Sequence, residues 1–448
     1  MQKILVIGAG RSSASLIKYL LGHAESEQWQ LTLAEKETKL AANKIGSNPY
    51  ATVLSLDVED HESVDKAIKS HDLVISMLPA RFHIAVAKSC AKFGTHFLTA
   101  SYLKEDIKQL DNQFREAGKT VIMEMGLDPG IDHMSAMKVI DELKENNCEL
   151  TGFETFTGGL IAEVSEGNNP WRYKFTWNPR NVVLAGQGTC KFIQEDRYKY
   201  IPYHKLFKRT EMIYIPGHGY FEGYANRDSL AYLDVYKLRG ISTLYRGTLR
   251  RPGFCAAWDV FVQLGATEDT YEMENVAAMT HRQYINSFLS YNPHDSVELK
   301  LAHYINQPVE SQTMHCLKWL GLFGNELVGL TKGTPAQILE HILKKKWSLD
   351  PQDRDMIVMW HKFNYLDGGK AKQIESSMVA LGEDQEQTAM AKTVGLPLGI
   401  AAKKILTGEI SLPGINIPTA RKIYGPVLDE LKSLGFEFQE RATEATIQ

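Results

Sequence analysis

"KILVIGAGRSSASLIKYLL", residues 3–21, is the segment that most clearly indicates how this chain folds. An apolar run rich in Ile and Val leads into Gly8 and Gly10, and then into a segment with apolar residues at helical spacing. A strand, a glycine turn and a helix start are the setting of a phosphate-binding turn, because Gly8 allows a tight turn and Gly10 lets the backbone approach a pyrophosphate. Ser13 replaces the third glycine of G-x-G-x-x-G and is small enough for close helix packing. The residues predicted to bind a dinucleotide here are Gly8, Ala9, Gly10, Arg11, Ser12 and Ser13.

More strand-like runs follow this turn at the spacing of βαβ units. The predicted strands cover 30–35, 51–58, 71–79, 95–101 and 119–126, and the predicted helices cover 61–70, 81–93 and 103–117. Six parallel strands with intervening helices predict an α/β fold with a Rossmann-type doubly wound sheet.

The carboxyl ends of these strands are the expected ligand crevice, because ligands of doubly wound sheets bind beyond that edge. After the last strand, "MEMGLDPGID" (123–132) holds Asp128 between glycines and a proline, which predicts a rigidly presented carboxylate. We expect Asp132 to cap the helix that follows. The residues predicted along the crevice are Met77, Leu78, Ser101, Tyr102, Leu127, Asp128 and Pro129.

The end of the second predicted strand bears on the choice of dinucleotide. Glu35 lies where an acid accepts hydrogen bonds from the ribose 2′-hydroxyl of NAD. The neighbouring Lys36 is instead suited to a 2′-phosphate, although the carboxylate would repel that group. We therefore expect NAD rather than NADP, with Asp57 and Val58 near the adenine ring.

Composition excludes several classes of protein. A chain of 448 residues predicts about two to three domains, and its net charge of -4 gives no general attraction to nucleic acid or anionic membranes. Five scattered cysteines form no C-x-x-C pair, and there is no H-E-x-x-H or clustered His/Asp motif, so we expect reduced thiols and no metal site. No apolar run reaches the roughly 18 residues that a membrane span requires. We expect a cytoplasmic protein.

Several segments, taken in order, resemble one family, the glutamate-forming saccharopine dehydrogenases, also called saccharopine reductases. These segments are "DLVISMLP" (72–79), "TASY" (99–102), "GLDPGIDHMSAMKVID" (126–141), "NNPWRYKFTW" (168–177), "YANRDS" (224–229), "YRGTLR" (245–250) and "AMAKTVGLPLGIAAKKIL" (389–406). The resemblance implies a Rossmann domain formed by 1–125 plus 391–448, and a large inserted α+β domain, 126–390, for substrate binding and dimerisation. The sequence itself predicts β-like runs at 149–159, 173–177, 211–216 and 242–250, and a helix-rich section from about 270 to 347. We expect a homodimer.

The resemblance also implies a reaction, in which saccharopine, NAD(P)+ and water are interconverted with 2-aminoadipate 6-semialdehyde, glutamate and NAD(P)H. Hydride transfer produces an imine, which water then hydrolyses. Since the substrate carries three carboxylates, the protein needs cations, and Arg227 and Arg246 are the best candidates. The other residues that we expect near the substrate are Ser101, Tyr102, Asp128, Thr157, Lys174, Gly247 and Thr248.

Proton transfer is assigned by the resemblance to Asp128 and Tyr102, with Lys174 as a further candidate. The family often has a cysteine where this chain has Thr157, and a threonine cannot act as a thiolate. His83 and His133 follow predicted strands, and we expect them to be helix-start residues bonded to the backbone. Two alternatives remain: a related imine-reducing enzyme such as carboxynorspermidine dehydrogenase, and a nucleotide-binding relative without catalytic activity.

Overall fold

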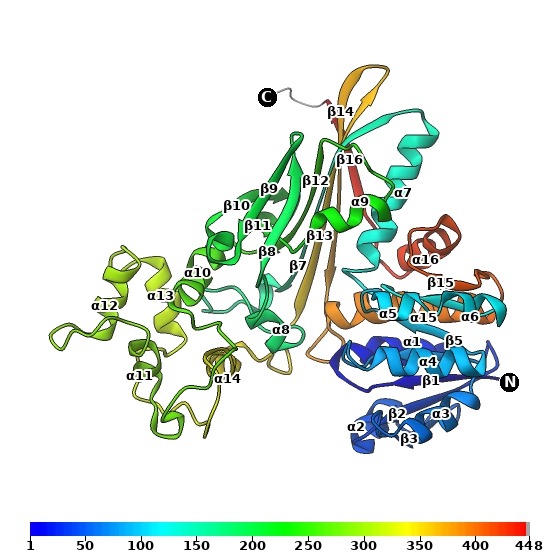
Figure 1. Ribbon diagram of the computed structural model, residues 1–448, viewed down its shortest axis with the longest axis horizontal. Helices are drawn as coiled ribbons and strands as arrows, with labels where there is room; N and C mark the ends of the chain where they lie inside the picture. Colours follow the sequence, from blue (N-terminus) through cyan, green and yellow to red (C-terminus); the bar gives the residue numbers. More distant parts are fainter. Residues whose placement is uncertain (445–448) are drawn as a thin grey trace. The chain divides into compact units, whose positions relative to one another are not determined.

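A computed structural model describes residues 1–444 of the chain, which divide into two compact units. The first unit contains Met1–Leu150 and Met378–Gln439, and the second contains Thr151–Ser377 together with the segment from Glu440. Each unit is described by itself below, and Figure 1 labels the elements of both.

The first unit is built on a seven-stranded sheet with the order β15-β6-β5-β4-β1-β2-β3. Its neighbouring strands all run parallel, which confirms the predicted Rossmann-type sheet. The strands are β1 (Gln2–Ile7), β2 (Trp29–Glu35), β3 (Ala51–Ser55), β4 (Leu73–Ser76), β5 (His96–Thr99), β6 (Thr120–Ile122) and β15 (Gly414–Asn416). The strand order reverses beside β1, and this is the switch point at which such sheets bind ligands. The seventh strand, β15, was not predicted, because three residues after a proline show no strand periodicity.

Helices cover this sheet and form a continuous apolar core with it. They are α1 (Ala14–His23), α2 (Thr38–Ile45), α3 (His61–Lys69), α4 (His83–Phe93), α5 (Glu105–Lys108), α6 (Asp111–Glu116), α7 (Ile131–Glu145), α15 (Ala389–Leu406) and α16 (Arg421–Ser433). The small residues of α15 let it approach α1 closely, since a Cβ at Gly395 would lie 2.7 Å from the backbone nitrogen of Leu16. The glycines of this segment therefore position the helix that begins at the glycine turn.

The division between the units differs from the predicted one at 125 and 391. Helix α7 belongs to the first unit because it packs on α16. The hydroxyl of Tyr424 donates to Asp141 at 2.7 Å, and Arg421 forms an ion pair with Glu145. The C-terminal part of the chain therefore holds α7 against the Rossmann sheet.

The second unit contains most of a mixed sheet with the order β10-β11-β12-β7-β13-β14-β16, to which β8 and β9 add a hairpin beside β12. Its strands are β7 (Glu149–Ile161), β8 (Thr189–Gln194), β9 (Arg197–Pro202), β10 (Thr210–Ile215), β11 (Gly219–Ala225), β12 (Thr243–Arg250), β13 (Asp355–Asp367), β14 (Lys370–Leu381) and β16 (Gln439–Glu444). The predicted runs at 149–159, 211–216 and 242–250 correspond to β7, β10 and β12. The long β13–β14 hairpin was missed, although its turn contains Gly368 and Gly369, both with positive φ, a common hairpin signal.

The run at 173–177 was predicted as a strand, and this prediction was wrong. Tyr173 and Phe175 are buried against the ring of Trp347, and the N–H of Phe175 donates to the carbonyl of Trp347 at 2.7 Å. The alternation of aromatic residues therefore reflects packing in a cluster and not sheet pairing. The helices of this unit are α8 (Pro179–Val183), α9 (Tyr232–Val235), α10 (Phe254–Leu264), α11 (His281–Asn286), α12 (Val297–Tyr304), α13 (Gln312–Trp319) and α14 (Pro335–Trp347), the last four in the predicted helix-rich section.

Within residues 1–444, no helix combines the length and the apolar character that crossing a membrane requires. Over the same residues, no three or more His, Cys, Asp or Glu side chains are grouped as they would need to be to hold a metal ion.

Candidate functional site

The glycine turn after β1 has the geometry that a dinucleotide requires. Gly8 has φ +106°, and a Cβ there would lie 3.2 Å from the carbonyl carbon of Met77, so only glycine fits at this position. At Gly10, by contrast, a Cβ would have no described heavy atom within 4 Å, so the backbone is open on that side. Ser13 is buried and its hydroxyl donates to the carbonyl of Gly10 at 2.8 Å, which closes the turn onto α1. The residues present therefore fit a dinucleotide phosphate at the start of a helix.

Glu35, at the end of β2, is bonded to this turn. One carboxylate oxygen accepts the N–H of Ala9 at 2.7 Å, and the other accepts the N–H of Lys36 at 2.9 Å. The predicted ribose-binding acid is thus placed beside the glycine turn by two backbone hydrogen bonds. This placement fits a role in binding the adenosine part of a dinucleotide.

Lys36 and Asp57 form an ion pair next to Glu35. Their charged atoms are 2.8 Å apart and both side chains are substantially exposed. Hydrogen bonding to Asp57 raises the pKa of Lys36, and the same bond lowers the pKa of Asp57. Because the pair is exposed, its net strength is small, and Lys36 is able to exchange its partner for an anionic ligand.

Lys44 is a site residue that the sequence did not reveal. Its ammonium donates to the carbonyl oxygen of Gly10 at 3.0 Å from α2, and burial lowers its pKa. A cation therefore lies against the phosphate-binding turn. Nothing in the local sequence distinguishes Lys44 from the exposed lysines around it, because only the packing of α2 brings it to the turn.

The segment after β6 forms a closed turn that presents Asp128. The N–H of Gly126 donates to the carbonyl of Pro129 at 3.0 Å, and the Asp128–Pro129 peptide bond is cis. Gly130 has φ +147°, and a Cβ there would lie 2.1 Å from the carbonyl oxygen of Gly126. Asp128 is partly exposed, whereas Leu127 is buried in the turn. The turn thus holds Asp128 at the carboxyl edge of the sheet, as expected.

Asp132 does not cap α7 as predicted, because the helix begins one residue earlier, at Ile131. Its carboxylate instead accepts the N–H of Gly130 at 2.6 Å, and the side chain is buried. Asp132 therefore stabilises the turn from within the first turn of the helix.

His83 begins α4 and His133 lies in the first turn of α7, as expected, and both are buried. The ring of His83 bonds to side chains instead of the backbone that we expected. The ring of His83 bridges the hydroxyl of Ser76 at 3.0 Å and that of Ser101 at 2.7 Å. Burial, and secondarily the charge of Lys104, lowers the pKa of His83 to about 4, so its imidazole is neutral near neutral pH. His133 is bonded to the carboxylate of Glu124 at 2.8 Å.

In the second unit, β7 and β12 bring several predicted substrate residues onto one face. Arg246 pairs with Thr155, and Thr248 pairs with Thr157, in the parallel register of these strands. The guanidinium carbon of Arg246 lies 3.9 Å from the ring centre of Tyr232, a cation–π distance. The hydroxyl of Thr157 is buried and has no hydrogen-bond partner among the described residues. An oxygen in this state is a ready partner for a polar ligand.

Gly247 has a packing role that the sequence did not suggest. A Cβ at this position would lie 2.1 Å from the ring of Phe156, so glycine is needed there. At Gly247 and Thr248, β12 pairs with β11 on one side and β7 on the other. Both residues thus lie within sheet ladders, which favours pairing of their backbone N–H groups with the neighbouring strands over donation to a ligand. Arg227 follows β11 with φ +51° and is exposed.

Lys174 was predicted to bind the substrate, but its ammonium is bonded to two aspartates. Its ammonium donates to Asp350 at 2.9 Å and to Asp353 at 2.6 Å, and the residue is only 9% exposed. Although burial disfavours the ammonium, the hydrogen bonds to the two aspartates raise its pKa overall. Two carboxylates already compensate its charge, so Lys174 is poorly suited to grip a third or to act as a neutral base.

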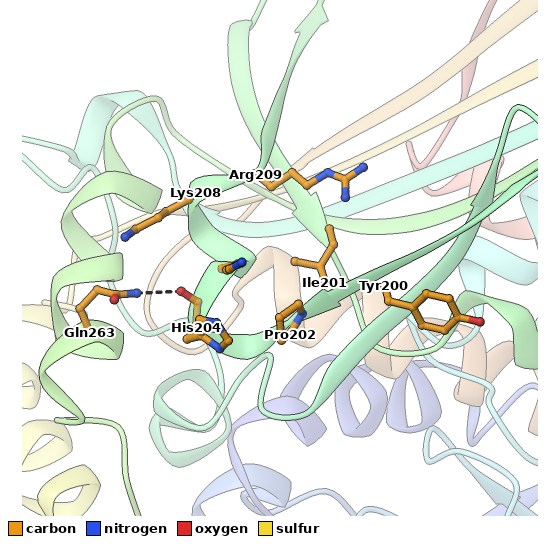
Figure 2. A pocket seen from close by; sticks show the side chains of 8 residues that line it. Tyr200, Ile201, Pro202, His204, Lys208, Arg209 and Gln263 are labelled. Carbon is orange, nitrogen blue, oxygen red and sulfur yellow. Dashed lines mark hydrogen bonds between the residues drawn. The ribbon is translucent and has the colours of Figure 1, made fainter.

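Figure 2 shows a pocket of about 370 Å³ on the second unit. Lys208, Arg209 and Gln263 are among its lining residues, and Gln263 donates to the carbonyl of His204 at 2.7 Å. A pocket of about 740 Å³ shares Lys208 and Gln263 with it. Neither pocket contains a residue predicted for the site, so neither bears on those assignments.

Two family descriptions of known proteins match most of this chain. Residues 4–122 match the family described as "Saccharopine dehydrogenase NADP binding domain", and residues 126–436 match "Saccharopine dehydrogenase C-terminal domain". The preference for NAD over NADP that Glu35 suggested is not supported, because the first description specifies NADP.

Individual relatives agree with these matches over nearly the whole chain. A protein of Schizosaccharomyces pombe named "Saccharopine dehydrogenase [NADP(+), L-glutamate-forming]" is 30% identical over 98% of this chain and 99% of its own length. The solved structure of the apo saccharopine dehydrogenase (L-Glu forming) of Saccharomyces cerevisiae is similar with a TM-score of 0.89, 29% identity and coverage of 99% of this chain and 100% of that one. The mitochondrial alpha-aminoadipic semialdehyde synthase of Rattus norvegicus is 33% identical over 99% of this chain, which spans only 48% of that protein.

Proposed function

The chain belongs to the saccharopine dehydrogenase family, and from this premise we propose that it is an NADP-dependent oxidoreductase of lysine metabolism. The reaction interconverts saccharopine, NADP+ and water with 2-aminoadipate 6-semialdehyde, glutamate, NADPH and a proton. The observation that carries the redox part is the glycine turn, in which the positive φ of Gly8 favours glycine and Gly10 is open. The similarity to the glutamate-forming enzymes covers at least 98% of the chain, and this supports saccharopine as the substrate.

The cofactor is held by the first unit in this proposal. Its phosphates bind at the turn from Gly8 to Ser13, with Lys44 as an additional cation, and its adenosine part binds beside Glu35. Lys36 binds the 2′-phosphate of NADP. Its ammonium is exposed, so it can exchange its ion pair with Asp57 for one with the phosphate. Glu35 is compatible with that phosphate because backbone N–H groups hold both of its carboxylate oxygens. When bound, the nicotinamide supplies the hydride acceptor.

The residues of the chain then bind and orient the substrate. Arg227 and Arg246 hold substrate carboxylates by charge-assisted hydrogen bonds, and the buried hydroxyl of Thr157 adds a neutral one. Tyr102 and Asp128 take a proton from the ammonium form of the secondary amine before hydride transfer, remove a proton from the water that attacks the imine carbon, and return a proton to the nitrogen as its bond to that carbon breaks. Thr157 takes no part as a nucleophile, since its hydroxyl has no neighbouring base among the described residues to activate it.

A direct assay tests the proposal. Purified protein is mixed with saccharopine and NADP+, and with NAD+ in parallel, and the absorbance of the reduced nicotinamide is followed. We expect reduction with both nucleotides and a higher kcat/KM with NADP+. Absence of reduction with either nucleotide contradicts the proposal, and turnover of carboxynorspermidine in place of saccharopine favours the related imine-reducing enzymes.

The homodimer and the cytoplasmic location expected from the sequence stay predictions. Light scattering of the purified chain measures its molecular mass in solution and tests the first. Microscopy of the tagged protein in its own cells tests the second.

A further inference from the structure

Glu124, a residue outside the predicted site, has a combination of features that calls for an explanation. It is 7% exposed, and its φ of +58° lies in the left-handed region, which non-glycine residues rarely adopt. Burying a carboxylate and straining the backbone both cost free energy, so surrounding contacts must hold this residue in place.

Those contacts converge on the loop that carries Tyr102. The N–H of Glu124 donates to the carbonyl of Ser101 at 3.0 Å, and one carboxylate oxygen accepts the N–H of Leu103 at 2.8 Å. The other carboxylate oxygen is bonded to His133 at 2.8 Å. Glu124 thus holds the residue before Tyr102 and the residue after it, while α7 anchors its carboxylate through His133.

A second anchor of the same loop is His83. The neutral ring of His83 binds the hydroxyl of Ser101 at 2.7 Å and is itself held by Ser76 on β4. The loop after β5 is therefore fixed directly to α4 and to the segment after β6, and through these to β4 and α7.

The pairing of β5 with β6 does not require the Glu124 side chain. Phe97 pairs with Val121 and Leu98 with Ile122, and the N–H of Met125 donates to the carbonyl of Thr99 at 3.1 Å. These contacts and a hydrogen bond from the N–H of Thr120 to the ring of His96 at 3.0 Å join the strands without Glu124, so its carboxylate serves the loop beyond them.

We propose that Glu124, anchored by His133, is a positioning residue that sets the place of the Tyr102 phenol at the carboxyl edge of the sheet. This inference rests on the proposed function, in which Tyr102 contacts the substrate. It predicts that loss of the Glu124 carboxylate lowers kcat through Tyr102 and leaves NADP+ binding at the glycine turn unchanged.

A double-mutant cycle tests this inference. We expect Glu124→Ala to lower kcat by about 100-fold, because a misplaced reacting group of this kind costs that much. In a Tyr102→Phe background the same substitution should lower kcat by less than about 3-fold, since it acts through a phenol that is no longer there. Glu124→Gln keeps an oxygen for the N–H of Leu103 and should recover most of the lost kcat. Equal effects of Glu124→Ala in the two backgrounds, or no effect of Tyr102→Phe, overturn the proposal.

A matched control separates positioning from general loss of stability. Glu154 is also 7% exposed, and its carboxylate binds Lys362 at 3.0 Å in the second unit. We expect Glu154→Ala to lower the melting temperature as Glu124→Ala does, and its effect on kcat to be the same with Tyr102 or Phe at position 102.

Hydrogen exchange gives a readout that does not depend on turnover. The amide of Leu103 should exchange at least about 10-fold faster in Glu124→Ala than in wild type and Glu124→Gln, because its hydrogen bond is lost. If the wild-type protein fails to oxidise saccharopine, the proposed function fails, yet this measurement still reports whether Glu124 holds the loop. Unchanged exchange in Glu124→Ala overturns the positioning role even in an active enzyme.

Discussion

The ammonium of Lys44 donates a hydrogen bond to the carbonyl oxygen of Gly10, 3.0 Å away, and so lies against the phosphate-binding turn. Burial lowers the pKa of Lys44, which shows that the surroundings of the ammonium disfavour its charge. An anionic ligand at the turn would favour that charge. The structure thus gives the turn a cation that contributes most when a phosphate is bound.

Lys44→Met should weaken NADP+ binding by about 10-fold, the effect of losing one charge-assisted contact. The dissociation constant, measured by calorimetry without substrate, checks this. Lys39→Met changes an exposed lysine of the same helix and should leave the dissociation constant within about 2-fold of wild type. Equal weakening by both variants contradicts a specific role for Lys44.

Lys36→Ala should discriminate between the two nucleotides. If Lys36 exchanges Asp57 for a 2′-phosphate, its removal raises the KM for NADP+ by about 10-fold and leaves the KM for NAD+ unchanged. NAD+ is the internal control, because it differs from NADP+ only by that phosphate. If the substitution raises the KM for NADP+ and the KM for NAD+ by the same factor, Lys36 instead supports the adjacent Glu35 segment.

Lys174→Met should destabilise the protein while sparing substrate affinity. The change leaves Asp353 buried without its cation, and breaking a buried pair costs about 3 kcal/mol. Denaturant unfolding measures the loss, and Lys332→Met, at an exposed pair with Glu272, should cost less than about 1 kcal/mol. A rise in the KM for saccharopine without a loss of stability would restore Lys174 to substrate binding.

Gly130→Ala should be much more damaging than Gly118→Ala, although both glycines have positive φ. A Cβ at Gly130 would lie 2.1 Å from the carbonyl oxygen of Gly126, whereas at Gly118 no described heavy atom would lie within 4 Å of it. We expect a loss of about 1 kcal/mol for Gly118→Ala from the left-handed backbone alone, and more than about 3 kcal/mol for Gly130→Ala. Similar losses in urea unfolding would contradict the steric account.

Stability should fall in acid because of His83. Its pKa is lowered from 6.5 to about 4 by burial, so between these values the unfolded chain binds a proton that the folded chain does not. The contribution of His83 to the free energy of unfolding is therefore complete above pH 6.5, and up to about 3 kcal/mol of it is lost as the pH drops to 4. The free energy of unfolding measured across this range should depend less steeply on pH in His83→Gln, whereas His61→Gln, at an exposed histidine of α3, should keep the wild-type dependence.

The predicted Rossmann sheet agrees with the structure because its signals are local. Each βα unit carries its own apolar run and turn, and the turn at Gly8 is recognisable from a few consecutive residues. The predictions that were wrong or missing concern elements set by residues far apart in the sequence. The aromatic alternation around Tyr173 resembles a strand, yet Trp347, far along the chain, decides that these rings pack in a cluster. The three-residue strand β15 exists because β6 offers it a partner.

The same contrast holds for the candidate site. The turn from Gly8 to Ser13, the acid at Glu35 and the closed turn around Asp128 follow from residue types at fixed short spacings, so they could be predicted from the residues alone. Which side chains meet depends on the packing of distant elements. Lys44 reaches Gly10 across 34 positions, and Lys174 reaches Asp353 across 179. Such contacts depend on how whole elements pack, and the residues next to a lysine in the sequence give no sign of the partner that packing assigns to it.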